Sequence, residues 1–514
     1  MSKSWNDGYF SEQAYISEYY RELAPNWLQF SLWLNDFCAP KISSYCELGF
    51  GNGISINVHA ATNSGEFFGT DFNPAHAAFA SELAQSSKAR LFDDSFQDFE
   101  GRVTRDKESS AQAASGFDAI ALHGIYSWIN RANRMHLVDF AAKQLKPGGV
   151  MYISYNALPG WTPSIPLRDL FYNHHKLGSK PGMGEAFAFA QRLLELNPRA
   201  VIDNPSIKSA LEAVLGHDEA YLAHEYLSDT FRAFNLSEVA TDFAKAKMSF
   251  ASSANSMEFI TSKDYDEEDL EFLRELKDVL LKEQAKDWLI NKKFRKDIFV
   301  KGARRLEAAQ SLFAFKNMHF MLTKPASKAP ERVEGRKRVL AFKEEAYKPL
   351  LELLESDNYR AKSGEEIIDA YGDEFSMYML KQVLAILTSQ GIISPAFSQQ
   401  EADKNAAKSL ALNKQLLEIS LDSSKLKALA SPVTGSAIIL NRFMNMFCYY
   451  AQQGFSEAND LVRLSAARLE ANGECVVKEG ERIEEPLAIR EFLQGEAKEF
   501  LKLLPILRAL RILD

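Results

Sequence analysis

In the first third of the chain, short apolar runs alternate with segments whose apolar residues recur at helical spacing. The apolar runs, which we predict as strands, are residues 45–48, 67–71, 89–92, 117–122 and 150–155. Helices are predicted between them at residues 54–61, 74–85 and 133–145, because apolar residues three and four positions apart lie on one helix face. Strands that alternate with helices are typical of βαβ units. The pattern predicts a doubly wound α/β sheet, in which ligands bind beyond the carboxyl ends of the strands.

The middle of the chain is mostly helical and is predicted to complete this sheet. Two helical insertions are expected, at residues 165–215 and 265–312. We predict residues 247–252 and 317–324 as the late strands, so that a seven-stranded domain spans residues 1–325. We expect the first insertion to lie over the ligand site.

The remaining third of the chain is predicted as a mainly α carboxyl-terminal region. Residues 326–339 carry proline and alternating charge and are predicted as a linker. Residues 340–398 contain three helical patterns, a glycine and a short apolar run, an order that is winged-helix-like. Residues 399–514 are predicted as a further helical domain around a hairpin.

Two segments of the chain have features found in nucleic-acid-binding proteins, but we predict that neither segment binds nucleic acid. The third helix of the winged-helix-like segment has Lys381 as its only charged side chain, whereas neutralising phosphates requires several Lys or Arg residues. Residues 291–305 are basic, but Phe294, Ile298 and Val300 interrupt the charges. We expect a solvated face there, interleaved with core residues.

Composition and charge indicate which broad classes of protein are compatible with this sequence. The 514 residues contain 60 Lys+Arg against 69 Asp+Glu and are 46% hydrophobic, which is typical of soluble globular proteins. Asn441, Arg442 and Asn445 interrupt the most apolar late stretch, so membrane insertion is not expected. The four cysteines form no CxxC pair, which fits a reducing compartment, and we expect a cytoplasmic protein.

The strongest chemical signal is the segment CELGFGNG, residues 46–53, at the end of the first predicted strand. Its glycines allow a tight turn and close approach of a ligand, and the helix that follows favours negative charge at its N-terminus. A dinucleotide fingerprint would need a glycine at position 54, which is Ile54. Glu47 instead precedes the first glycine by two residues, and Asp71 and Asp94 follow the next two strands. Asp71 could accept both hydroxyls of a ribose.

Together with Leu122-His123-Gly124 and LKPGGVMYIS, these features resemble the motif series of class I S-adenosylmethionine-dependent methyltransferases. The resemblance implies a Rossmann-like sheet and S-adenosyl-L-methionine as the cofactor. It implies the following cofactor-binding residues: Glu47, Gly49, Gly51 and Gly53 for the methionine part, Asp71 and Phe72 for the ribose, Asp94 and Ser95 for the adenine, and His123 bordering both methionine and acceptor. An aromatic amino terminus often closes such sites, so one of Tyr15, Tyr19 and Tyr20 is expected at the ligand, and we choose Tyr20.

Longer segments, among them YYRELAP, GTDFNPAHAAFA and FRKDIFVKGARRL, resemble bacterial methyltransferases with a methyltransferase regulatory domain. The rickettsial lysine methyltransferases of outer-membrane proteins are more distantly similar. This distant resemblance implies methyl transfer to a protein lysine, with an outer-membrane or surface protein as partner, and it leaves a homodimer open. The alternatives are a small-molecule or cell-envelope methyltransferase and a non-catalytic scaffold that kept the cofactor fold.

An acceptor lysine, with a pKa of about 10.4, must lose a proton before attack, so a base or a desolvating aromatic wall is expected nearby. Candidates follow the fourth and fifth strands and the first insertion: Tyr126, Trp128, Asn156, Trp161, His224, Glu225 and Tyr226. The last three could equally form a structural hydrogen-bond network. No metal site is predicted, because the adjacent His174 and His175 point to different helix faces.

Overall fold

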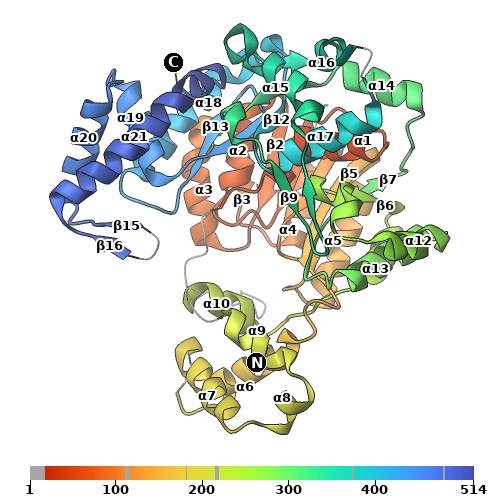
Figure 1. The fold of residues 1–514 in the computed structure, drawn as a ribbon. Coiled ribbons are helices and arrows are strands. Elements are labelled where there is room, and N and C mark those ends of the chain that lie inside the picture. The colour runs from red at the N-terminus through yellow and green to blue at the C-terminus, as the bar shows by residue number, and fades with distance from the viewer. Residues whose placement is uncertain are drawn as a thin grey trace.

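The structure is a computed structural model that describes residues 18–109, 116–180, 182–214, 219–372, 375–478 and 481–513, without the side chains of 106–109, 219–221 and 224. Its centre is a seven-stranded sheet in the order β3-β2-β1-β4-β5-β7-β6 (Figure 1). The strands are β1 (Ser44–Leu48), β2 (Glu66–Thr70), β3 (Arg90–Phe92), β4 (Phe117–Leu122), β5 (Leu145–Asn156), β6 (Met248–Ser253) and β7 (Phe294–Lys301). Only β7 runs antiparallel to its neighbours β5 and β6 within this sheet. The predicted seven-stranded α/β architecture is confirmed.

Helices cover both faces of the sheet, which explains why its central strands read as continuous apolar runs. All six residues of β4 are buried. One core lies between the sheet and the helices α4 (Phe96–Ser109), α5 (Arg131–Gln144) and α11 (Leu236–Ala244). The other core lies between the sheet and the helices α1 (Pro25–Leu34), α2 (Ile54–Thr62) and α3 (Pro74–Ser87).

The predicted composition of the late sheet was partly wrong. Residues 248–253 form β6 as expected, but residues 319–322 form β8 (His319–Leu322) in a separate three-stranded sheet. The seventh strand is β7, inside the segment predicted as a second helical insertion; α12 (Glu267–Glu275) and α13 (Val279–Leu289) precede it and α14 (Ala308–Lys316) follows it. The pattern concealed β7 because two of its buried residues are charged. Arg295 and Asp297 are each 1% exposed and pair with one another, Nε to Oδ2 at 2.9 Å.

The first insertion forms a lobe of its own, which projects from the body of the molecule in Figure 1. It consists of α6 (Ser164–Leu177), α7 (Met183–Glu195), α8 (Arg199–Asp203), α9 (Ser206–Val214) and α10 (Glu219–Tyr226). Trp161, Phe171 and Tyr226 belong to a small core within this lobe. The described residues of this segment are thus mostly helical.

The carboxyl-terminal region shares a sheet with the segment that precedes the predicted linker. β8 lies between β11 (Lys362–Ser363) and β12 (Ile393–Ala396), and the helices α15 (Glu344–Tyr359), α16 (Gly364–Tyr371) and α17 (Met377–Ser389) belong to the same unit. Lys381, on α17, is buried and donates to Asp36 Oδ1 at 2.6 Å and to the Trp33 carbonyl. The one charged side chain of α17 thus joins this helix to the end of α1.

The last part of the chain packs directly on the domain formed by the seven-stranded sheet. It contains α18 (Gln399–Ser420), the hairpins of β13 (Ala428–Ser431) with β14 (Ser436–Ile439) and of β15 (Val476–Lys478) with β16 (Glu481–Ile483), and the helices α19 (Arg442–Gln452), α20 (Ala458–Ala471) and α21 (Pro486–Ala509). Figure 1 shows α18 beside α2 and α3. Leu412 and Leu416 of α18 share a core with Val58 and Leu83.

Polar contacts also bind α18 to the end of α2. Lys408 Nζ donates to the carbonyls of Ala60 at 2.8 Å and Asn63 at 3.1 Å, and Ser409 Oγ donates to the Ala61 carbonyl at 3.0 Å. A cation at a helix C-terminus is favourable because it faces the negative end of the helix dipole. Within the described ranges, none of the helices has the length and apolar character needed to cross a bilayer.

We predict that a chain ending at residue 327 will not fold into a stable domain. The truncation removes β11 and β12 from the two sides of β8 and uncovers the apolar face of α2 and α3, which leaves an exposed patch prone to aggregation. Expression, solubility and binding of a hydrophobic dye will test this. A soluble truncated chain with one cooperative thermal transition would contradict it.

Candidate functional site

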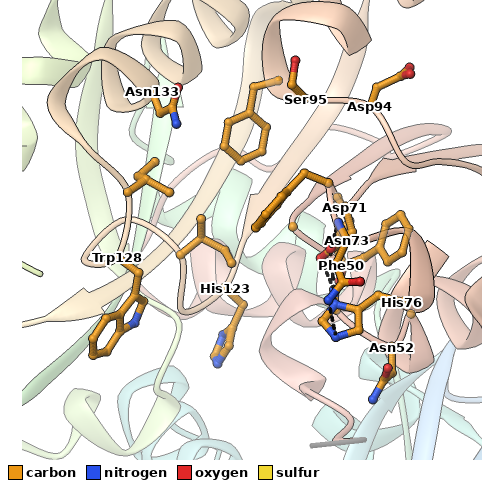
Figure 2. A pocket seen from close by; sticks show the side chains of 18 of the residues that line it. Phe50, Asn52, Asp71, Asn73, His76, Asp94, Ser95, His123, Trp128 and Asn133 are labelled. Atoms are coloured by element: carbon orange, nitrogen blue, oxygen red, sulfur yellow. Dashed lines mark hydrogen bonds and ion pairs between the residues drawn. The ribbon is translucent and has the colours of Figure 1, made fainter. Parts of the chain in front are cut away.

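A cavity of about 330 Å³ lies at the carboxyl ends of the first four strands of the sheet (Figure 2). The structure places all ten residues that were predicted to bind the cofactor in its lining: Tyr20, Glu47, Gly49, Gly51, Gly53, Asp71, Phe72, Asp94, Ser95 and His123. They come from the segment before α1 and from the loops after β1, β2, β3 and β4. This convergence follows from the parallel strands, whose carboxyl ends meet at one edge of the sheet.

The glycine-rich loop after β1 is held in a conformation that side chains would obstruct. Gly51 and Gly53 have φ angles of 57° and 69°, which lie in the left-handed region that favours glycine. A Cβ atom on Gly53 would come within 2.4 Å of the Ala80 Cβ on α3. The Gly51 amide donates to Asp71 Oδ2 at 2.8 Å, so the loop is fixed to the residue that follows β2.

Asp71 organises three neighbouring groups. Besides the Gly51 amide, its carboxylate accepts from the Asn73 amide at 3.0 Å and lies 3.3 Å from His76 Nδ1. Figure 2 shows Asp71, Asn73 and His76 pointing toward one another. An ionised carboxylate offers about four lone-pair sites. These three contacts therefore leave Asp71 with little more than one site for a ligand hydroxyl.

Glu47 is the least satisfied group of the cavity. Its side chain is buried, and Oε2 has no hydrogen-bond partner among the described residues. Burial, followed by the charge of Asp71, raises the pKa of Glu47 to about 8. A buried acceptor without a donor costs free energy, so this oxygen fits a ligand that brings a cationic or hydrogen-donating group to the cavity, such as the ammonium of a methionine moiety.

His123, after β4, is held between two aromatic residues. Its ring stacks on the ring of Tyr20 with centroids 3.8 Å apart, and Nδ1 lies 2.8 Å from the Tyr152 hydroxyl. Burial lowers the pKa of His123 to about 3, so the imidazole is neutral at pH 7. The Tyr20 amide donates to Ser55 Oγ at 3.0 Å, which fixes Tyr20 to the first turn of α2.

Asp94 and Ser95 lie at the opposite end of the cavity, and both make contacts within the protein. Arg102 Nη2 donates to Asp94 Oδ1 at 2.9 Å, and Ser95 Oγ donates to Asp98 at 2.7 Å. Phe96 and Phe72 line the cavity with them. Adenine binding by Asp94 and Ser95 stays a prediction, and an adenine here would contact an aromatic wall.

Of the aromatic, Asn, Glu and His candidates predicted near the acceptor whose side chains the structure describes, only Trp128 lines the cavity. The Tyr126 hydroxyl donates to Asp242 at 2.9 Å within the core, and the backbone N–H of Asn156 donates to Ser127 Oγ at 2.9 Å. None of the described residues of the first insertion lines the cavity. The expectation that this insertion lies over the ligand site is therefore wrong for its described residues.

An aromatic series nevertheless connects Trp128 to the lobe. Phe231 lies 4.9 Å from Trp128 and 4.5 Å from Trp161, and Trp161 lies 6.0 Å from Tyr226, as ring centroid distances. Burial raises the pKa of Glu225 to about 7, opposed by the charge of Lys293. The side chain of His224 lies outside the described part of the structure. Catalytic roles for Tyr126, Trp128, Asn156, Trp161 and residues 224–226 stay predictions.

Sequence reasoning missed His76, which lines the cavity and contacts Asp71. A signal was present, since Asn73 caps α3 and Pro74 begins it, and a helix start at this point turns residue 76 back toward residue 71. Among the described residues, no cluster of three or more His, Cys, Asp or Glu side chains could hold a metal ion.

Comparison with known proteins identifies the family to which this chain belongs. A protein of Synechocystis sp. is 31% identical over 507 residues, which covers 97% of this chain and 97% of that protein. A family profile described as "Predicted methyltransferase regulatory domain" matches residues 218–301. The chain belongs to the methyltransferase family that carries this domain. In this chain the domain runs from α10 to the end of β7 and so contains the last two strands of the sheet.

Solved structures share the fold of this methyltransferase family. PKMT2 from Rickettsia typhi, solved in complex with AdoHcy, superposes with a TM-score of 0.65 at 16% identity and covers 96% of this chain and 99% of that chain. By sequence alone, a Rickettsia prowazekii protein is also similar: it is 24% identical over 184 residues, which is 35% of this chain and 33% of that protein. The superposition extends over nearly the whole of both chains, so this chain and PKMT2 share the same fold.

We predict that Glu47→Gln will stabilise the cofactor-free protein, increasingly so as the pH rises from 5 to 8. The folded-state pKa of about 8 lies above the ordinary value of 4.5, so in this window the folded chain binds more protons than the unfolded chain. Its stability then falls with rising pH by up to about 1.4 kcal/mol per pH unit. Glutamine does not titrate and escapes this loss.

Thermal unfolding at several pH values will measure the difference between variant and wild type. Glu100→Gln is the control, because Glu100 accepts from Lys143 Nζ at 2.7 Å on the outer helices α4 and α5. A Glu47→Gln difference that stays constant across the pH range would contradict the assigned burial of this charge.

Proposed function

We propose that this chain transfers a methyl group from S-adenosyl-L-methionine to a protein lysine side chain. The buried carboxyl group of Glu47 beside the glycine loop, whose Oε2 has no hydrogen-bond partner among the described residues, is the observation that carries the cofactor part of the proposal. An ammonium ion at that oxygen would satisfy both groups, and its charge would stabilise the ionised form of Glu47. The fold shared with an AdoHcy-bound protein supports the same cofactor.

The residues of the cavity suggest how such a cofactor would be oriented. The loop from Gly49 to Gly53 would hold the methionine part, the free lone pair of Asp71 one ribose hydroxyl, and the wall around Asp94 and Ser95 the adenine. His123 and Tyr20 would then border the reacting end. The bound cofactor supplies an electrophilic methyl group on a sulfonium; when the N–C bond forms, the electron pair of the S–C bond returns to sulfur.

The proposal that the acceptor is a lysine is supported by the surroundings of His123 and by the sequence resemblance to rickettsial lysine methyltransferases. An ammonium cannot attack, so it must first release a proton to solvent or to a base. Tyr20, neutral His123 and Trp128 form a largely apolar border, which lowers the pKa of an amine by desolvation. We expect an outer-membrane or surface protein as the substrate and a cytoplasmic location for the reaction.

We predict that Asp71→Ala will weaken binding of S-adenosyl-L-methionine by about ten- to a hundredfold, because a charged hydrogen bond is lost and the Gly51 amide is released. Isothermal titration calorimetry with wild type and variant will measure this, and circular dichroism will verify that the variant is folded. If wild type and Asp71→Ala bound S-adenosyl-L-methionine with the same dissociation constant, the assignment of Asp71 to the cofactor site would be wrong.

A second prediction concerns the acceptor. Incubation of the full chain with isotopically labelled S-adenosyl-L-methionine and a bacterial lysate should label protein, and mass spectrometry should find the label on lysine. Label on small molecules or envelope components would identify the alternative methyltransferase. Cofactor binding without any labelled product would favour a scaffold that kept the cofactor fold.

A further inference from the structure

A second and larger cavity adjoins the cofactor cavity. Its volume is about 840 Å³, and Glu18 and Tyr20 line both cavities. Its walls come from distant parts of the chain: the segment before and within α1, one residue of β7, the strands β12 and β14, and the helices α19 and α21. Folding of the complete chain is therefore needed to form it.

Tyr20 separates the two cavities. Its ring stacks on His123, which lines only the cofactor cavity, while Tyr20 itself also faces the second one. Phe294, at the start of β7, lies 6.1 Å from His123 between ring centroids. The end of the cofactor cavity that we assign to the methionine part is thus the end that meets the second cavity.

An ion pair lies in the second cavity close to this partition. Lys296 Nζ contacts Glu22 Oε1 at 2.6 Å, and the two side chains are 29% and 14% exposed. Glu22 follows Tyr20 by two residues, and Lys296 follows Phe294 by two residues, so both lie close to the aromatic residues around His123. The charge of Lys296 lowers the pKa of Glu22, so this carboxylate is ionised at neutral pH.

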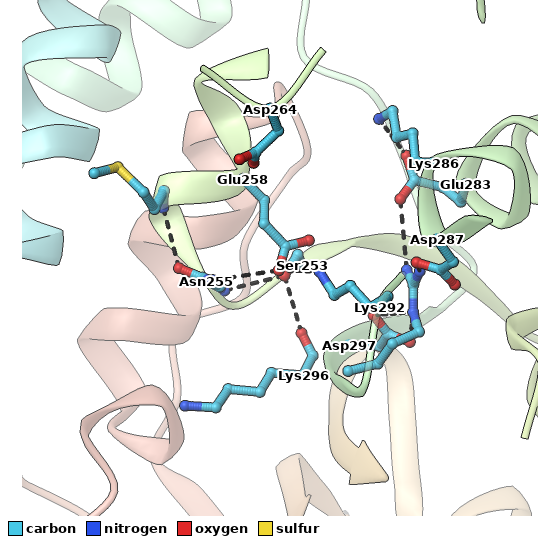
Figure 3. Close-up of polar contacts among 12 residues, drawn as sticks. Ser253, Asn255, Glu258, Asp264, Glu283, Lys286, Asp287, Lys292, Lys296 and Asp297 are labelled. Carbon is cyan, nitrogen blue, oxygen red and sulfur yellow. Dashed lines mark hydrogen bonds and ion pairs between the residues drawn. The ribbon is translucent and has the colours of Figure 1, made fainter. Parts of the chain in front are cut away.

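The geometry of β7 explains why Lys296 faces this cavity. Successive strand residues point to opposite faces, and Arg295 and Asp297 lie in a buried charge cluster with Asp287. Figure 3 shows Lys296 extending away from that cluster (Figure 3). The side chain of Lys296 therefore takes no part in the buried charge cluster of Arg295, Asp297 and Asp287.

The other cations of the cavity are bound by groups of the chain. Arg21 donates to the carbonyls of Thr388 and Ser389 at 2.9 and 2.7 Å, and Lys324 donates to the Gln390 carbonyl at 3.0 Å. These carbonyls end α17, where the helix dipole favours positive charge. Lys328 lies 3.4 Å from Glu499. Glu22, two residues from Tyr20, is thus a carboxylate of this cavity that pairs with a primary ammonium, that of Lys296.

We propose that the second cavity admits the acceptor lysine and that Glu22 binds its ammonium before methyl transfer. This inference rests on the proposed function. The contact with Lys296 shows that a primary ammonium reaches Glu22 at hydrogen-bond distance in this position. Trp27, Leu440 and Met444 in the walls suit the aliphatic stem of a lysine, which packs on apolar surface while its head stays polar. An incoming lysine competes with Lys296 for the same carboxylate.

The competition predicts effects of opposite sign for the two partners. In the full chain saturated with AdoHcy, binding of Nα-acetyl-lysine methylamide is measured by NMR titration. Glu22→Gln should weaken this binding by about tenfold or more, with the AdoHcy dissociation constant unchanged within about twofold. Lys296→Met should instead strengthen it, because the internal competitor is gone; a purely structural ion pair would predict weakening in both variants.

Two controls complete the experiment. Glu100→Gln removes a carboxylate that also binds a lysine, away from both cavities, and should leave the titration unchanged. Nα-acetyl-norleucine methylamide lacks the ammonium and should not bind. Unchanged lysine binding in Glu22→Gln, weakening in Lys296→Met, or equal binding of the norleucine compound would overturn the proposal. Failure of AdoHcy itself to bind would instead overturn the proposed function.

Discussion

Burial of α2 from both sides is the constraint on which the rest of the structure depends. All nine residues of this helix are buried, because the sheet covers one side and α18 covers the other. The glycine loop enters α2 at its N-terminus, and Lys408 and Ser409 bind its C-terminal carbonyls. A helix fixed at both ends cannot shift, so the loop before it keeps the cavity open at the edge of the sheet. The carboxyl-terminal region supports the site through this helix without lining the cofactor cavity.

Two kinds of buried charge occur in this protein and have different consequences. Arg295 donates to Asp297 and Asp287, and the Tyr155 hydroxyl also donates to Asp297, at 2.6 Å. Such compensation offsets desolvation and lets a charged strand lie inside the sheet. Glu47 lacks a partner for one oxygen. Its burial is destabilising in the free protein, as is common for groups whose purpose is binding rather than stability.

The segment from Glu18 to Leu23 contacts three parts of the molecule: the two cavities, the end of α17 and β7. Tyr20 forms the wall between two cavities, Arg21 binds the end of α17, and Glu22 pairs with Lys296 of β7. Through the pair of Glu22 with Lys296, this segment contacts the matched regulatory domain, residues 218–301, beside the cofactor cavity.

The sequence by itself determined the class I sheet and the ten residues assembled around the cofactor cavity, because each of those signals is local: a strand end, a glycine turn or a carboxylate placed by a parallel strand. It misassigned β7 and β8, since the charges of Arg295 and Asp297 hide an internal strand and the partners of β8 lie beyond residue 360. The second cavity could be recognised only from the tertiary structure. Glu22, Lys296 and Met444 are each more than 140 residues apart in the sequence, and no local periodicity indicates which distant side chains will face one another.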